Sequence, residues 1–146
     1  MRAPTPSQTV GPFYAIGLCR RDDNTLDPNG IELTGLLLDG QEQPIPDGMI
    51  ELWDPTRRLW GRSGTDASGR FAFVVPREAD VLEALVFARG LLRHQRTRVY
   101  LRDTGDGVLG GLAPARRTTL LASPEGDGMR FDIRMQGDHA TVFFVQ

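Results

Sequence analysis

Turn-forming residue pairs that end in glycine recur along this chain, and they limit the length of any regular element between them. They are Asp39-Gly40, Asp47-Gly48, Ser68-Gly69, Arg89-Gly90, Asp106-Gly107 and Asp127-Gly128. The intervening runs are short and rich in β-branched and aromatic residues. In one of them, Met129, Phe131, Ile133 and Met135 alternate with Arg130, Asp132 and Arg134. This period of two is typical of strands with one buried face.

The pattern predicts an all-β fold, a sandwich or a barrel. A helical period around residues 78–85 is weak and predicts one helical turn at most. The predicted strands lie near residues 32–38, 49–54, 70–75, 84–88, 96–102, 117–121, 129–135 and 140–145.

The first thirty residues differ from the rest. They are rich in Pro, Asp, Asn and Gly, with scattered apolar residues such as Phe13, Tyr14 and Ile16. A segment of this composition buries too little apolar area by itself to offset its ordering entropy. We therefore expect an extended N-terminal arm over residues 1–30 that lies on another surface, and a single β-sandwich domain over residues 31–146.

Charge and cysteine content restrict the function classes. The formal net charge is −2, whereas proteins that coat nucleic acid need an excess of Lys and Arg. The single cysteine, Cys19, cannot form an intramolecular disulfide, which fits a reducing compartment. No apolar run is long enough for a signal peptide or a membrane span, so the sequence predicts a cytoplasmic protein.

Five segments, taken together and in order, resemble intradiol ring-cleavage dioxygenases, and within them the alpha subunits of protocatechuate 3,4-dioxygenases. The segments are TPSQTVGPFYAIGL, LTGLLLDGQEQPIPDGMIELWDP, GTDASGRFAFVVP, VFARGLLRHQRTRVYL and RFDIRMQGDHATVFF. The motif T-D-x-x-G-x-F alone is weak, because transthyretin-like and carrier sandwiches share it. The resemblance implies a β-sandwich of the intradiol dioxygenase type.

The family's iron ligands are missing. Catalytic intradiol chains bind ferric iron with two Tyr and two His, the latter in an H-x-H strand that would fall here at Val81-Leu82-Glu83. The long loop before that strand is reduced to residues 76–80. The chain contains two tyrosines and two histidines, the same number as the iron ligands of the family. They lie in the predicted arm, in a predicted strand and in two turns: Tyr14, Tyr100, His94 and His139. The resemblance implies no metal ligands and no catalytic residues on this chain, and Fe(III) on a partner beta subunit.

Arg98 is the main candidate for substrate binding. Arg96, Arg98, Tyr100 and Arg102 share one face of a predicted strand, and Thr97, Val99 and Leu101 take the core face. A guanidinium on a rigid strand suits bidentate capture of a carboxylate. From the pattern alone, a solvated or interfacial ion pair is the favoured interpretation. The resemblance implies that Arg98 points across a subunit boundary at the carboxylate of the substrate.

Thr9, Gly11 and Pro12 form the second candidate. Gly permits close backbone approach to a ligand, and Pro fixes the local geometry. The resemblance implies that this part of the arm lines the mouth of the partner's active site; the alternative is an ordinary extended arm broken by Gly-Pro. Trp53 is expected to pack in a core or an interface.

The resemblance implies a function in aromatic catabolism. An iron-bearing beta subunit would cleave protocatechuate to 3-carboxymuconate, and this chain would line the substrate pocket. Two alternatives are a metal-free transthyretin-like binding module and a self-associating pseudoenzyme. Neither a nucleic acid nor a membrane is an expected partner.

Overall fold

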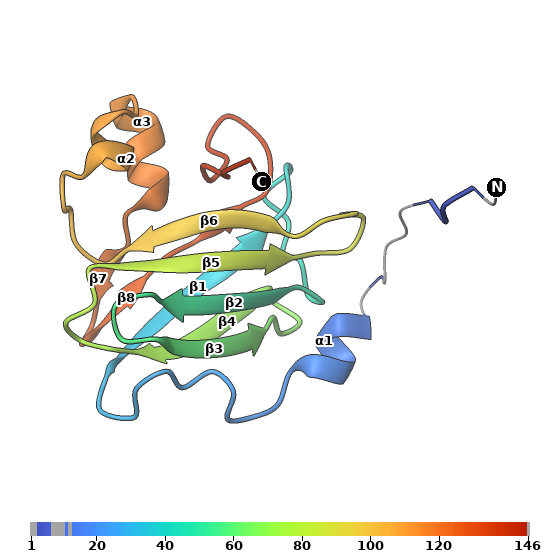
Figure 1. Ribbon diagram of the computed structural model, residues 1–146, viewed down its shortest axis with the longest axis horizontal. Coiled ribbons are helices and arrows are strands. Elements are labelled where there is room, and N and C mark those ends of the chain that lie inside the picture. The colour runs from blue at the N-terminus through green and yellow to red at the C-terminus, as the bar shows by residue number, and fades with distance from the viewer. Residues whose placement is uncertain (1–2, 7–10, 12, 146) are drawn as a thin grey trace.

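Two β-sheets packed face to face form the body of the protein (Figure 1). The computed structural model describes residues 3–6, 11 and 13–145. The first sheet has the order β4 (Arg70–Val75), β1 (Ile31–Leu38), β8 (Gly128–Arg130), β7 (Ser123–Glu125), with β9 (Ile133–Arg134) also paired to β1. The second sheet has the order β3 (Leu59–Gly64), β2 (Met49–Asp54), β5 (Val81–Phe87), β6 (Gln95–Tyr100). The sandwich predicted from the sequence is confirmed.

The core lies between the two sheets and follows the alternation of side chains along the strands. In β5 every second residue is buried, and β4 shows the same pattern. Leu33, Phe73, Ile50 and Leu82 are fully buried between the sheets. Burying side chains of this size contributes about 1.5–3 kcal/mol each. The period of two in the sequence therefore identifies the inward faces correctly.

Gly35 permits a close approach of two chain segments in the first sheet. A Cβ atom at this position would lie 1.8 Å from the carbonyl oxygen of Phe131. The neighbouring carbonyl of Thr34 accepts a hydrogen bond from the Phe131 amide at 2.8 Å. Any side chain at residue 35 would separate β1 from the C-terminal strands. Their pairing with β1 is parallel, whereas every other strand pair is antiparallel among the described residues.

Two predicted strands were wrong. The weak helical period around residues 78–85 forms no helix, because β5 begins at Val81. The strand expected at 117–121 is replaced by α3 (Pro114–Arg117) and the 3-10 helix η1 (Thr118–Leu120), because Pro114 begins a helix and Thr118 and Thr119 bond back to the carbonyls of Ala115 and Arg116. The stretch 140–145 makes a single bridge, between Phe144 and Arg96, in place of a strand.

A second, smaller core covers the outer face of β6. It consists of Tyr100, Leu109, Leu120 and Val142, which come from β6, α2 (Gly107–Gly110), η1 and the C-terminal segment. Thr97 donates a hydrogen bond to the Val142 carbonyl at 2.7 Å, which ties the C-terminal segment to β6. As a result, the end of β6 is covered on both sides.

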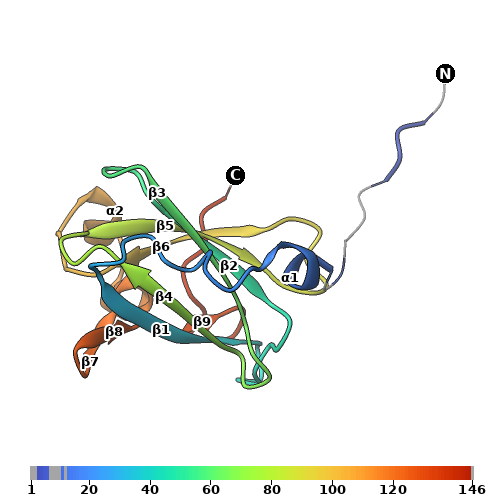
Figure 2. The same cartoon turned by 90° about the horizontal axis from the view of Figure 1, so that it is seen from below.

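The segment before β1 contains the short helix α1 (Phe13–Leu18) at one end of the sandwich (Figure 2). The ring of Tyr14 lies 6.0 Å from that of Phe87, which in turn lies 5.4 Å from that of His94. Farther along, the amide of Leu26 donates to the Val74 carbonyl at 2.8 Å. Within the described ranges, every helix falls short of the length and apolarity needed to cross a bilayer.

Candidate functional site

Arg98 lies on the outer face of the second sheet, directly opposite Glu83 of the neighbouring strand. Its Nη2 atom is 3.7 Å from Glu83 Oε1, and its Nη1 atom donates to the Tyr100 hydroxyl at 3.4 Å. The guanidinium also lies 5.7 Å from the ring centroid of Phe144. The side chain keeps 32% of its surface exposed. Arg98 is therefore held in place by its own chain and still open to a ligand.

Tyr100 connects Arg98 to the start of helix α2. Its hydroxyl donates to Asp106 Oδ2 at 2.9 Å, while Asp106 Oδ1 accepts the amides of Val108 and Leu109. Hydrogen bonds donated by the Leu109 backbone amide and by the Tyr100 hydroxyl hold the pKa of Asp106 below its usual value. Burial raises the pKa of Tyr100, and the bond to Tyr100 raises the pKa of Arg98. Arg98 is thus a cation and Asp106 an anion at neutral pH, with a neutral phenol between them.

Sequence reasoning placed Tyr100 on an exposed face with Arg98, and it missed Asp106. Tyr100 does lie on the outer face of β6, as predicted, but it is fully buried because α2, η1 and the C-terminal segment cover it. An Asp before Gly-Val-Leu is an N-cap signal in the sequence. That signal could have identified Asp106.

Two tryptophans extend this outer face toward β3. Trp53 and Trp60 are paired in register across β2 and β3, and they are 37% and 42% exposed. They border a shallow cavity of about 200 Å³ together with Glu51, Glu83 and Leu85. The guanidinium of Arg62 lies 4.8 Å from the Trp60 ring. An aromatic pair exposed on a sheet face is typical of a contact surface.

Of the other predicted site residues, the structure describes Gly11. Thr9 and Pro12 lie outside the described residues. Gly11 is in a turn with φ of 67°, in the left-handed region that favours glycine. The helix that follows it rests on Phe87, four residues along β5 from Glu83, a spacing of about 13 Å at the rise of a β-strand. Among the described residues, α1 therefore lies at the Phe87 end of β5, whereas Arg98 lies opposite Glu83.

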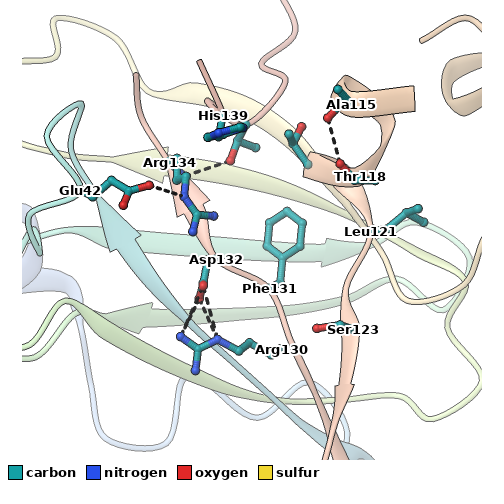
Figure 3. A pocket seen from close by; sticks show the side chains of 12 residues that line it. Glu42, Ala115, Thr118, Leu121, Ser123, Arg130, Phe131, Asp132, Arg134 and His139 are labelled. Atoms are coloured by element: carbon teal, nitrogen blue, oxygen red, sulfur yellow. Dashed lines mark hydrogen bonds and ion pairs between the residues drawn. The ribbon is translucent and has the colours of Figure 1, made fainter. Parts of the chain in front are cut away.

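A cavity beside the C-terminal strands has a different character (Figure 3). It has a volume of about 390 Å³, and Arg130 and Arg134 point toward it. Arg130 is engaged by Asp132 at 3.1 Å and by Glu125 at 3.3 Å, and Arg134 pairs with Glu42 at 3.4 Å. Because its cations are matched by acids at hydrogen-bonding distance, this cavity is a poorer carboxylate site than the face around Arg98.

The described residues do not fit an iron site. In these ranges there is no group of three or more His, Cys, Asp or Glu side chains arranged to hold a metal ion. Tyr14 and His94 contact Phe87, the Tyr100 hydroxyl is engaged by Asp106 and Arg98, and His139 lines the cavity of Figure 3. The four Tyr and His side chains do not converge. At the family's H-x-H position, Val81 and Glu83 lie opposite Tyr100 and Arg98.

Comparison with known proteins gives two close relatives over nearly the whole chain. The chain is 32% identical to the protocatechuate 3,4-dioxygenase alpha chain of Burkholderia cepacia, over 96% of both proteins. It is 33% identical to the protein of the same name from Pseudomonas putida, over 96% of this chain and 95% of the relative. No family model matches the chain.

A solved structure supports the fold. The dioxygenase domain of a dioxygenase–carbohydrate-binding protein fusion from Streptomyces sp. SirexAA-E matches 92% of this chain and 99% of its own, with a TM-score of 0.53 and 22% identity. The alignment with the Burkholderia relative spans 189 positions, of which this chain fills about 140, because 96% of its 146 residues are aligned. About 49 aligned positions therefore have no counterpart here. The link between β4 and β5 comprises residues 76–80.

Proposed function

The chain belongs to the family of protocatechuate 3,4-dioxygenase alpha chains, and from this premise we propose that it is the iron-free subunit lining the substrate pocket of an iron-bearing beta subunit. Its relatives are subunits of an oxidoreductase, so its activity is that of an enzyme subunit. Ferric iron on the beta subunit supplies the ring-opening chemistry that converts protocatechuate to 3-carboxymuconate. This chain contributes substrate binding and orientation.

The position of Arg98 is the observation that carries this proposal. Its contact with Glu83, at 3.7 Å, is longer than a hydrogen bond, so a substrate carboxylate can replace it without breaking one. A guanidinium has five N–H donors in a planar fork, and the contacts described on this chain engage Nη1 and Nη2. The outward donors are then available for bidentate capture of a carboxylate from the partner's pocket.

The N-terminal arm supplies the second part of the pocket in this proposal. Residues 1–30 act as an arm that reaches the beta subunit, and Thr9, Gly11 and Pro12 border the aromatic ring of the substrate. The packing of Tyr14 against Phe87 supports this role, because it fixes the base of the arm beside Gly11. The placement of α1 at the Phe87 end of β5, about 13 Å from Glu83, also supports it, since a pocket that uses Gly11 and Arg98 together would be completed by another chain.

Substitution of Arg98 in the complex tests the proposal. We expect Arg98→Ala, in a complex with an iron-bearing intradiol beta chain, to raise the dissociation constant of protocatechuate tenfold to hundredfold. A lost charge-assisted hydrogen bond costs about 1.5–3 kcal/mol. Iron content should stay at one per pair of chains. Arg102→Ala is the matched control, because Arg102 also carries a guanidinium in an ion pair, but with Asp80 and not with Glu83.

Two results would reject the proposal. Unchanged protocatechuate affinity in the Arg98→Ala complex would remove Arg98 from the pocket. A chain that forms no complex with an iron-bearing beta chain, and elutes as a dimer of itself, would instead identify a self-associating pseudoenzyme.

A further inference from the structure

Resting on the role proposed for Arg98, we infer that Tyr100 and Asp106 are positioning residues that set the direction of the Arg98 guanidinium and thereby the selectivity for carboxylate-bearing substrates. Neither residue touches the substrate in this assignment. They act through Arg98, by a chain of contacts that begins at the backbone of α2.

The first link is the fixed carboxylate of Asp106. Its Oδ1 atom accepts the amides of Val108 at 2.9 Å and Leu109 at 3.0 Å, so the side chain is held by the first turn of α2. Its Oδ2 atom accepts the Tyr100 hydroxyl at 2.9 Å. The two oxygens therefore have separate roles, one toward the helix and one toward the tyrosine, and the carboxylate cannot rotate without losing both.

The second link is the direction of the Tyr100 hydroxyl. A phenol has one O–H donor, which here is directed to Asp106, so its lone pairs remain to accept a hydrogen bond. Arg98 Nη1 lies at 3.4 Å and donates to it. Tyr100 is fully buried among Leu109, Leu120 and Val142, so its ring has no room to swing. The buried phenol thus offers Arg98 an acceptor at a fixed place.

The third link is the restraint on the other sides of Arg98. Phe144 lies under the guanidinium at 5.7 Å, and Glu83 lies across the sheet at 3.7 Å. Without the Tyr100 hydroxyl, the contacts with Phe144 and Glu83 would be the restraints that remain on Arg98 among those described above. The charge of Glu83 would then draw the guanidinium toward β5. Tyr100 holds Nη1 while Nη2 faces Glu83, so the planar fork keeps one orientation. A pre-oriented fork loses less entropy on binding a carboxylate than a mobile one.

The test compares Tyr100→Phe, Asp106→Asn and Arg98→Ala in the complex with an iron-bearing beta chain. Each complex is titrated without dioxygen, once with protocatechuate and once with catechol, the same diol without the carboxylate. We expect Tyr100→Phe to weaken protocatechuate binding about threefold to tenfold, the range for one uncharged hydrogen bond. Catechol binding should not change. Asp106→Asn preserves the cap of α2, since Asn and Asp are equally good N-caps, and should show a smaller effect of the same kind.

The outcomes separate positioning from general structure. Equal weakening of both diols by Tyr100→Phe would mean that Tyr100 only supports the fold and would overturn the inference. The inference would also be overturned if the dissociation constant of protocatechuate were unchanged in Tyr100→Phe while Arg98→Ala showed a large loss of protocatechuate affinity. If Arg98→Ala itself has no effect, the proposed role of Arg98 fails and the inference fails with it. Should Tyr100→Phe not fold, Asp106→Asn decides the question by the same comparison.

Discussion

Glu83 and Arg98 lie directly opposite each other on β5 and β6, with Oε1 and Nη2 3.7 Å apart. The other carboxylate oxygen of Glu83 accepts a hydrogen bond from Arg96 at 3.2 Å. One acid therefore faces two arginines, and only Arg96 is within hydrogen-bonding distance of it. In the proposed pocket, the substrate carboxylate competes with Glu83 for Arg98.

We predict that Glu83→Gln tightens protocatechuate binding to the complex by up to about fivefold. The substitution removes the competing charge, and partly exposed ion pairs are worth about 0–1 kcal/mol. Titration without dioxygen measures the change. Glu51→Gln is the control, because Glu51 pairs with Arg62 on the same face. Weaker binding in Glu83→Gln would show that Glu83 orients Arg98 instead of competing for it.

The buried hydroxyl of Thr97 gives a prediction for stability. It donates to the Val142 carbonyl at 2.7 Å, and Thr97→Val keeps the shape while removing the donor. We expect the free energy of unfolding to fall by about 1–3 kcal/mol, because a buried carbonyl loses its partner. Urea unfolding measures it. Thr118→Val, at an exposed threonine that also bonds a carbonyl, should change the free energy by less than about 0.5 kcal/mol.

The two tyrosines of the chain should ionise late in alkaline titration. Burial, with a further contribution from Asp47, raises the pKa of Tyr14 to about 12, and burial also raises the pKa of Tyr100. A raised folded-state pKa contributes stability below the unfolded value of about 10. For Tyr14, this contribution is lost as the pH rises from about 10 through about 12. Phenolate absorbance follows the ionisation, and Tyr14→Phe should remove the step near pH 12. Two tyrosines that titrate together near pH 10 in the folded protein would contradict this assignment.

Both tryptophans of the chain lie on the outer face that carries Arg98, so tryptophan emission should report assembly. We expect a shift to shorter wavelength when the beta subunit binds, because Trp53 and Trp60 would lose their contact with water. Replacing both with Ser should weaken the complex at least thirtyfold, since tryptophans central to interfaces contribute about 2 kcal/mol or more. A stoichiometric complex with unchanged emission would place the partner on another face.

Local sequence pattern was sufficient for the strands whose own side chains alternate. The prediction matched β1, β2 and β4 within one residue. It missed β3, where Trp60, Arg62 and Ser63 lie in a run without a simple apolar alternation, and where pairing with β2 determines the strand. It also missed α1 and α2, because helices of four to six residues give too few turns for a helical period.

In the candidate site, too, the local pattern predicted what depends on a single strand and missed what depends on tertiary contacts. Alternation along one strand placed Arg98 on the outer face, and the family resemblance gave it a role. The burial of Tyr100 and its link to Asp106 depend on segments that fold back over β6 from residues 107–120 and 142. Such packing joins residues by tertiary contact and has no signature in the local period. Asp106 was readable only as a helix cap.

The parallel pairing of β1 with β8 and β9 determines the order in which the protein can be completed during translation. All strands of the second sheet lie between residues 49 and 100, so that sheet can assemble once β6 has left the ribosome. One edge of β1 stays unpaired until the C-terminal residues have been synthesised. Asp132, for example, accepts a hydrogen bond from the Leu36 amide and lies 96 residues further along the chain. Until then the nascent chain exposes an unpaired strand edge, which is prone to pair with other chains. The second sheet can therefore form before the first is complete, and a chain interrupted before residue 128 is left with a half-built and aggregation-prone first sheet.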